Sequence, residues 1–200
     1  MLKIEKGEPW ILWPNYICDG IIDYPAGRIL DGDSNFTFEL EFQVDTEIVE
    51  GKGTVFAKLP SYFGLDVTPN GFQLLIPEWD ETSEEFKVIT VDNLNKLDIY
   101  NKNTIKIEYI DSVLRIYLGG DEVFTNDYLY TGLPTDNNSH IIFGAGNFPK
   151  NGFNLNYITL KLFNLHIYKD TNLISHHKFD KFIHNKSYDY SETGNFIHKI

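Results

Sequence analysis

The chain has 200 residues, of which 29 are acidic and 17 are Lys or Arg, so its formal net charge is −12. This charge argues against a nucleic-acid partner, because affinity for phosphates depends on Lys and Arg displacing counterions, and it disfavours an anionic membrane surface. Aromatic residues make up 15% of the chain, which favours half-buried strands, and all-β chains of this length commonly form one unit. We therefore expect one domain, residues 1–200.

The cysteine content and the apolar runs set further limits. Cys18 is the only cysteine, which excludes an intramolecular disulfide and a cysteine-based metal site. No apolar run approaches the roughly 20 residues needed to cross a bilayer, and residues 1–13 lack the apolar stretch of a signal peptide. The sequence therefore predicts a protein without membrane insertion that is not exported by a signal peptide.

Strand-like alternation is clearest between Asn35 and Asp45. Five apolar residues, from Phe36 to Val44, occupy every second position, and polar residues separate them. A period of two predicts a strand with one buried face and one wet face. Shorter runs bounded by Pro, Gly, Asn and Asp predict further strands at residues 54–58, 64–67, 71–76 and 86–91.

A meander follows in the second half of the chain. Strands are predicted at residues 104–109, 113–118 and 122–124, joined by tight turns at Asp111-Ser112 and at Gly119-Gly120. Glycine permits the positive φ that short hairpin turns require. Residues 140–143 and 157–168 predict a short and a long strand, and no window shows the helical period. The pattern predicts an all-β, antiparallel two-sheet β-sandwich.

Several of these segments together resemble a known family. They are ICDGIIDY at 17–24, SNFTFELEF at 34–42, GTVFAK at 53–58, the hairpin at 103–123, IIFGAGN at 141–147 and the strand at 157–168. Their order is similar to that of the laminin-G-like branch of the concanavalin A-like lectin and glucanase superfamily. The resemblance implies a concanavalin A-like jelly roll that serves as a recognition module.

The last part of the chain adds a second resemblance. Residues 174–195 are similar to the closing segments of laminin-G-like proteins carried by bacteriophages, in which a final hairpin follows the long strand. This likeness implies a virion component that reaches the extracellular medium on lysis. Such a protein needs no export signal of its own.

Metal and cofactor sites are not predicted. Calcium sites of the family use acidic residues, but here Ile22 precedes Asp23, and Leu160-Lys161-Leu162 replaces a more acidic strand. Calcium is therefore possible through the resemblance but is not supported by the residues. His176 and His177 are adjacent, and adjacent strand residues point to opposite faces, so the two cannot share an ion without a bulge.

The strand at residues 35–45 carries only part of the acidic pattern that glycosidases of the superfamily use. Retaining enzymes of the superfamily place acids at alternating positions of one strand, so that nucleophile and acid/base share a face. Glu39 and Glu41 fit that spacing, but Gln43 takes the third position, and an amide is not a general acid or base at neutral pH. We interpret the two acids as the solvent face of an amphipathic strand and predict no catalytic residue.

Carbohydrate binding needs a flat ring to stack on sugar C–H groups and polar groups to satisfy the hydroxyls. Tyr62, Trp79 and Tyr130, expected in loops, and Asn147, in an expected turn, are the candidate ligand-binding residues. Trp79 stands out because it lies in Pro77-Glu78-Trp79-Asp80 between predicted strands. The equally weighted alternative is that Trp79 caps one end of the sandwich or packs on a neighbouring subunit.

Three functions remain open from the sequence. The first is a glycan-binding adhesin, fibre or decoration subunit of a phage particle. The second is a purely structural subunit that contacts other virion or surface proteins, or a second copy of itself, and has no sugar affinity. The third is a glycan hydrolase or lyase with a nonstandard acid pair.

Overall fold

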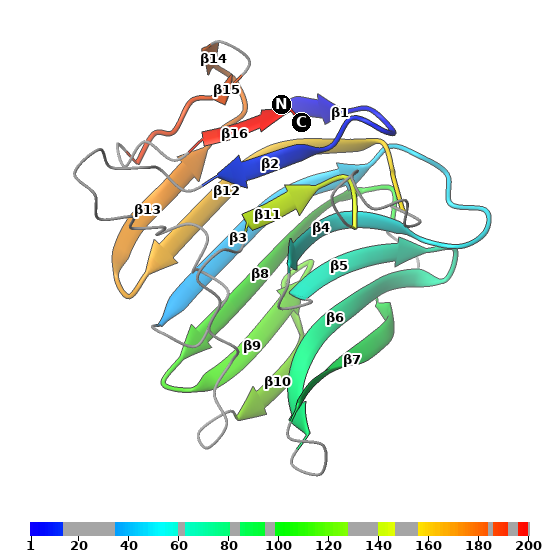
Figure 1. The fold of residues 1–200 in the computed structure, drawn as a ribbon, viewed down its shortest axis with the longest axis vertical. Helices are drawn as coiled ribbons and strands as arrows, with labels where there is room; N and C mark the ends of the chain where they lie inside the picture. Colours follow the sequence, from blue (N-terminus) through cyan, green and yellow to red (C-terminus); the bar gives the residue numbers. More distant parts are fainter. Residues whose placement is uncertain are drawn as a thin grey trace.

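The computed structural model describes nine stretches of the chain: residues 1–13, 35–59, 63–80, 85–94, 99–127, 140–146, 156–183, 186–191 and 196–199. All the regular structure in these stretches is β-strand, arranged as two antiparallel sheets in two layers (Figure 1). The predicted all-β sandwich is confirmed. The segment at 17–24 lies outside the described residues. Within the described residues, no helix is long and apolar enough to cross a membrane.

One sheet has seven strands, with β3 and β12 near its middle. Strand β12 pairs with β3 on one side, and on its other side it pairs with β1 along its first part and with β13 along its second. The order is β1 (Leu2–Ile4), β12 (Leu160–Lys169), β3 (Phe36–Val44), β8 (Lys102–Ile110), β9 (Val113–Leu118) and β10 (Asp121–Asp127), with β13 (Asn172–His177) beside β12.

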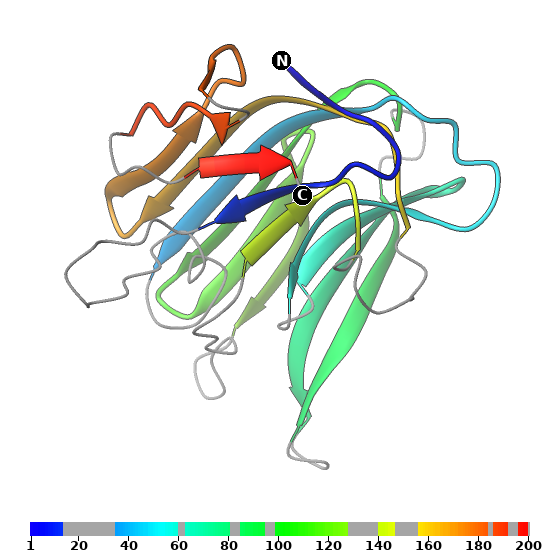
Figure 2. The ribbon, with the colours of Figure 1, turned by 45° about the horizontal axis from the view of Figure 1, so that its top comes forward.

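The other sheet has nine strands and brings the two ends of the chain together. Figures 1 and 2 show the blue β2 beside the red β16, which pair antiparallel. The order is β14 (Phe182–Ile183), β15 (Lys186–Ser187), β16 (Phe196–Lys199), β2 (Trp10–Trp13), β11 (His140–Phe143), β4 (Gly53–Leu59), β5 (Phe63–Thr68), β6 (Gly71–Asp80) and β7 (Glu85–Leu94).

The core lies between the sheets and combines Ile, Leu and Val side chains with aromatic rings. All five apolar residues of β3 are at most 1% exposed, and the residues between them are half-buried, as the alternation predicts. The ring centroid of Phe38 lies 5.1 Å from that of Phe56 on β4, and that of Phe42 lies 5.6 Å from that of Phe72 on β6. Because these pairs join one sheet to the other, they fix how the layers stack.

Both predicted hairpin turns of the meander are confirmed. Asp111 and Ser112 have φ of 52° and 66°, and Gly119 and Gly120 have φ of 65° and 98°. Two successive residues with positive φ form the tight turn whose twist matches that of the flanking strands. The side chain of Asn35 supports the first turn, since its Oδ1 accepts a hydrogen bond of 3.0 Å from the Asp111 amide.

Strand β6 extends beyond the predicted residues 71–76 and continues to Asp80. The prediction stopped at Pro77, because proline cannot donate to a sheet ladder. In the structure, β5 pairs with β6 only as far as Leu75, so Pro77 leaves no bond to β5 missing, while β7 continues alongside. The long strand predicted at 157–168 begins at Leu160 and ends at Lys169.

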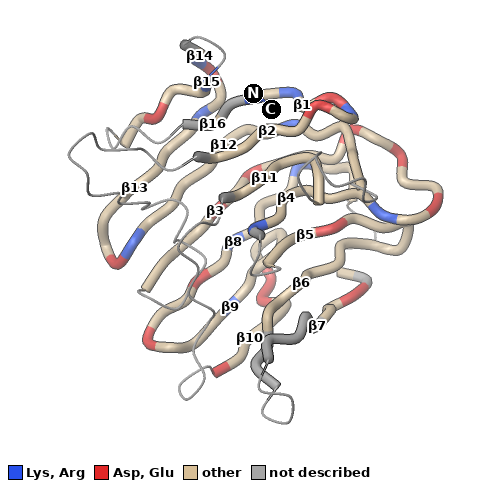
Figure 3. Tube along the Cα trace, in the orientation of Figure 1, with Lys and Arg blue, Asp and Glu red and all other residues tan. Residues whose placement is uncertain are grey.

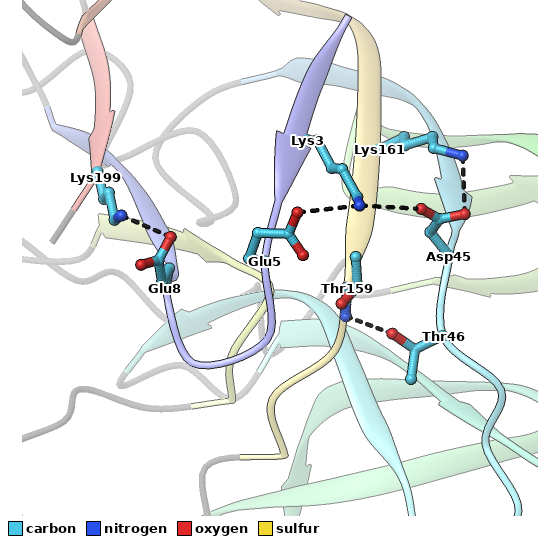
Figure 4. A network of polar contacts seen from close by, with 8 residues as sticks. All are labelled: Lys3, Glu5, Glu8, Asp45, Thr46, Thr159, Lys161 and Lys199. Carbon is cyan, nitrogen blue, oxygen red and sulfur yellow. Dashed lines mark hydrogen bonds and ion pairs between the residues drawn. The ribbon is translucent and has the colours of Figure 1, made fainter.

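Ion pairs lie where β1 pairs with β12. Lys3 on β1 lies directly opposite Lys161 on β12. Asp45 lies between them, with its Oδ1 2.8 Å from the Lys161 ammonium and its Oδ2 3.8 Å from that of Lys3 (Figure 4). Glu5 adds a second carboxylate 3.0 Å from Lys3. Figure 3 shows acidic positions continuing from here along the loop between β3 and β4.

Candidate ligand-binding face

The face of the seven-stranded sheet that points away from the core, here called the outer face, carries many charged and aromatic side chains. On β3 it presents Glu39, Glu41 and Gln43, all half-buried, which confirms the predicted wet face of this strand. On β8 the same alternation places Lys106 and Glu108 on that side. The outer face therefore combines both signs of charge.

One row of the outer face crosses six neighbouring strands. Each of its members is the direct cross-strand partner of the next, and directly opposed residues on one face are close enough for their side chains to interact. In order from β13 to β10 the row is His176, His166, Glu39, Lys106, Tyr117 and Glu122.

A hollow of about 640 Å³ lies over the β8 part of the outer face. Tyr117 from β9 contributes the aromatic ring in its lining, and Gly119 and Gly120 form part of its wall without side chains. The full lining is Glu39, Lys102, Asn103, Thr104, Lys106, Glu108, Tyr117, Gly119 and Gly120. A hollow of this size matches the small-ligand sites of proteins.

Ion pairs fix the charged groups of the hollow. The Lys106 ammonium lies 2.6 Å from Glu108 Oε1, and the hydrogen bond from Lys106 to Glu108 raises the pKa of Lys106. The Lys102 ammonium lies 2.6 Å from Glu41 Oε1 and 4.6 Å from the ring centroid of Phe163 on β12. Paired charges of this kind present hydrogen-bond donors and acceptors side by side at neutral pH.

The ring of Tyr117 lies beside these charges. The Lys106 ammonium is 5.7 Å from its centroid, within the range of a cation–π contact. Burial and the nearby carboxylates of Glu108 and Glu122 raise the pKa of the Tyr117 phenol. Tyr117 therefore keeps its proton at neutral pH and offers both a flat ring and a hydroxyl group.

These groups suit binding a hydroxyl-rich ligand better than cleaving one. An apolar ring with adjacent carboxylates and ammonium groups can contact both the C–H face and the hydroxyls of a sugar. On β3 the third position of the glycosidase spacing is taken by Gln43, whose Nε2 donates a 2.8 Å hydrogen bond to the Tyr100 carbonyl. That position is therefore a tethered amide.

A run of rings continues the outer face beyond β12. Successive ring centroids are 6.4 Å, 4.3 Å, 5.7 Å and 4.8 Å apart along Tyr168, His166, His176, Tyr190 and Tyr188. The ammonium of Lys178 lies 4.8 Å from the Tyr190 centroid, and that of Lys181 lies 4.1 Å from the Tyr188 centroid. The Tyr190 hydroxyl donates a 2.8 Å hydrogen bond to Asp180, which raises the pKa of Tyr190.

Three of the four residues predicted to bind a ligand lie outside the part of the chain that the structure describes. Tyr62, Tyr130 and Asn147 lie outside the described residues. The expectation that Trp79 lies in a loop is wrong, because its backbone belongs to β6 and pairs with Phe86 of β7; its side chain is outside the described residues. The four residues therefore stay a prediction as a site.

From the sequence, Glu39 was interpreted as part of a solvent face, and three other residues that line the hollow were not considered as ligand-binding residues. Lys106, Glu108 and Tyr117 lie on strands that were correctly predicted, and the alternation in those strands already placed them on one face. The missing information was that β8 pairs with β3, which brings Glu39 beside Lys106. Pairing between strands far apart in sequence is not visible in the period of either strand.

Comparisons with known proteins bear on the fold. No protein-family model matches the chain, and no curated protein matches it. Among solved structures, a protein from Bacteroides ovatus whose carbohydrate binding is inferred matches 99% of this chain and 58% of its own, with 13% identity and a TM-score of 0.58. The binding domain of botulinum neurotoxin serotype D matches 83% of this chain and 38% of its own, with 12% identity and a TM-score of 0.52.

A second structure shows the serotype D ligand-binding domain in complex with N-acetylneuraminic acid. Its similarity covers 83% of this chain and 38% of the neurotoxin chain, with 12% identity and a TM-score of 0.51. This chain thus spans less than two thirds of each of these proteins. At these identities the likeness concerns the fold. The chain shares with these proteins the fold of an antiparallel two-sheet β-sandwich.

Proposed function

We propose that the chain is a non-catalytic carbohydrate-binding module whose ligand lies on the outer face of the seven-stranded sheet. The observation that carries this proposal is the hollow in which the ring of Tyr117 lies beside the Lys106–Glu108 ion pair. A ring beside fixed donors and acceptors is the arrangement that sugar recognition needs. The similarity to the binding domains of the two neighbouring proteins supports the proposal at the level of the fold.

The test is a glycan array followed by titration of the best ligand, with calcium and with a chelator. Tyr117→Ala is expected to weaken binding at least about tenfold, because a stacked ring contributes strongly to such contacts. Tyr117→Phe keeps the ring and is expected to keep most of the affinity. If Trp79→Ala lost glycan binding while Tyr117→Ala bound fully, the site would instead lie at the predicted residues Tyr62, Trp79, Tyr130 and Asn147.

The finer assignment rests on the sequence resemblance. On that basis the module belongs to the laminin-G-like branch and acts as an adhesin, fibre or decoration subunit of a bacteriophage particle, found in the virion or outside the cell after lysis. Mass spectrometry of purified virions is the check, and a particle lacking this polypeptide would contradict the assignment. We also infer a single domain over residues 1–200, because β2 near the start pairs with β16 near the end.

The alternative is a structural subunit that contacts other proteins and has no sugar affinity. An array without binding under any condition would favour it. Self-association belongs to the same alternative, and light scattering of the purified protein separates an assembly from a monomer of about 23 kDa. A hydrolase is the least supported function, and a polysaccharide panel that yields no new reducing ends would exclude it for those substrates.

A further inference from the structure

Two imidazole rings face each other on the outer face. His166 on β12 and His176 on β13 are direct cross-strand partners, and their ring centroids are 4.3 Å apart with an interplanar angle of 33°. Both side chains are half-buried and therefore reachable from solvent. The two rings already occupy one small region of the surface.

A β-bulge creates this opposition. At the hairpin end, Lys169 pairs with Asn172 and Tyr168 with Leu173, and continuing that register would place His166 opposite Ser175. The register shifts by one residue between Ile167 and Tyr168, so that His166 lies opposite His176 instead. One extra residue in β13 therefore brings two histidines together on one face.

His176 and His177 point to opposite sides of β13, as adjacent strand residues do. His177 is fully buried, whereas His176 lies on the outer face. The partner of His176 on the neighbouring strand is instead His166. Directly opposed residues have Cβ atoms about 4.5–5.5 Å apart, so rotation of the two rings can turn one nitrogen of each toward a common ion at about 2.0–2.1 Å.

The surroundings of the pair favour a bound cation in two ways and oppose it in one. Glu39 lies directly opposite His166 on the β3 side and supplies negative charge. Asp189 Oδ1 accepts a 2.9 Å hydrogen bond from the His176 amide and anchors the backbone there. Lys178 is the opposing charge, and burial, His166 and Lys178 together lower the pKa of His176.

We propose that His166 and His176 form a two-imidazole binding site for a divalent transition-metal ion of the Zn²⁺, Ni²⁺ or Cu²⁺ class, which imidazole ligands suit. Among the described residues, no group of three or more His, Cys, Asp or Glu side chains is arranged to hold an ion. The site therefore has two protein ligands, with water in the other positions. It is open and binds more weakly than a closed structural site.

Calorimetric titration of the full chain with Zn²⁺ and with Ni²⁺ at about pH 7.5 tests the site. One ion per chain is expected, and His166→Gln and His176→Gln are each expected to weaken binding at least about tenfold. His140→Gln is the matched control, because His140 lies on β11 in the other sheet. Thermal melts without metal verify that the variants are folded.

Two results would overturn the proposal. One is the absence of binding up to about millimolar metal, and the other is an affinity that neither His166→Gln nor His176→Gln changes. Location is checked by NMR, in which paramagnetic Cu²⁺ is expected to broaden amide signals of β12 and β13 around the pair first. Broadening centred on another part of the chain would equally contradict the site.

Discussion

The imidazole Nδ1 of His177 lies 3.0 Å from the hydroxyl oxygen of Ser187, and both residues are buried. The contact joins β13, in the seven-stranded sheet, to β15, in the nine-stranded sheet. Burial lowers the pKa of His177 to about 4, although the charge of Asp189 acts in the opposite direction. The neutral ring is therefore part of the contact between the two sheets.

Acid is expected to destabilise the protein through His177. Between pH 6.5 and about 4 the unfolded imidazole binds a proton that the folded one does not, so the free energy of unfolding falls as the pH falls through this window. The full effect is about 3 kcal/mol. Urea denaturation at pH 7 and at about pH 4.5 measures it. His177→Gln should show a clearly smaller loss, and equal losses in both proteins would refute this account.

Asp45 is expected to stabilise the fold mainly by offsetting the repulsion between Lys3 and Lys161. Directly opposed like charges destabilise a strand pair, so Asp45→Asn should lower the melting temperature slightly, and Lys161→Gln in that background should restore part of it. The difference should shrink in about 1 M salt. The hydrogen bond from Lys161 lowers the pKa of Asp45 below 3.8. The stability that Asp45 contributes is therefore present at neutral pH, and it is lost in stronger acid than the stability that the neutral His177 contributes. A salt-independent effect of Asp45→Asn would contradict this explanation.

Gly53 on β4 is expected to tolerate no side chain. A Cβ at this position would lie 1.7 Å from Cγ2 of Ile158, which is fully buried. Gly53→Ala should therefore cost at least about 1–3 kcal/mol of unfolding free energy, as overpacking does. The variant Ile158→Ala removes the clashing group, so the double variant should be more stable than the sum of the two single effects predicts. Strict additivity in urea denaturation would show that the two residues are not in conflict.

The edge of the seven-stranded sheet is expected to resist pairing with a second chain. Strand β10 lies at this edge, and three of its seven residues are acidic: Asp121, Glu122 and Asp127. Charge on an edge strand disfavours edge-to-edge association. Replacing Glu122 and Asp127 with Thr should increase the average mass in light scattering. As a control, replacing Glu47 and Glu50 of the β3–β4 loop with Thr changes the net charge equally and should leave the average mass unchanged. If both double variants associated equally, the net charge alone would explain the association.

The sequence predicted those features that depend on a period within one strand. The alternation from Phe36 to Val44 was sufficient to predict β3, its buried face and its wet face. The position of Trp79 was wrong, because the effect of Pro77 depends on where β5 stops pairing with β6. His166 was missed for a similar reason, since only the register shift in β13 places it opposite His176. Register and pairing partners depend on packing, which no single strand encodes.

The pairing of β12 with β3 also has a consequence for how the protein folds. These two strands form the longest contact in the middle of their sheet, yet one lies early in the chain and the other late. Closing so large a loop costs entropy before the core contacts of Phe38 and Phe42 can repay it, so folding should be slow compared with that of proteins rich in local contacts. A nascent chain that ends before residue 160 would leave one edge of β3 open, and this edge is the part of the protein most in need of protection during synthesis.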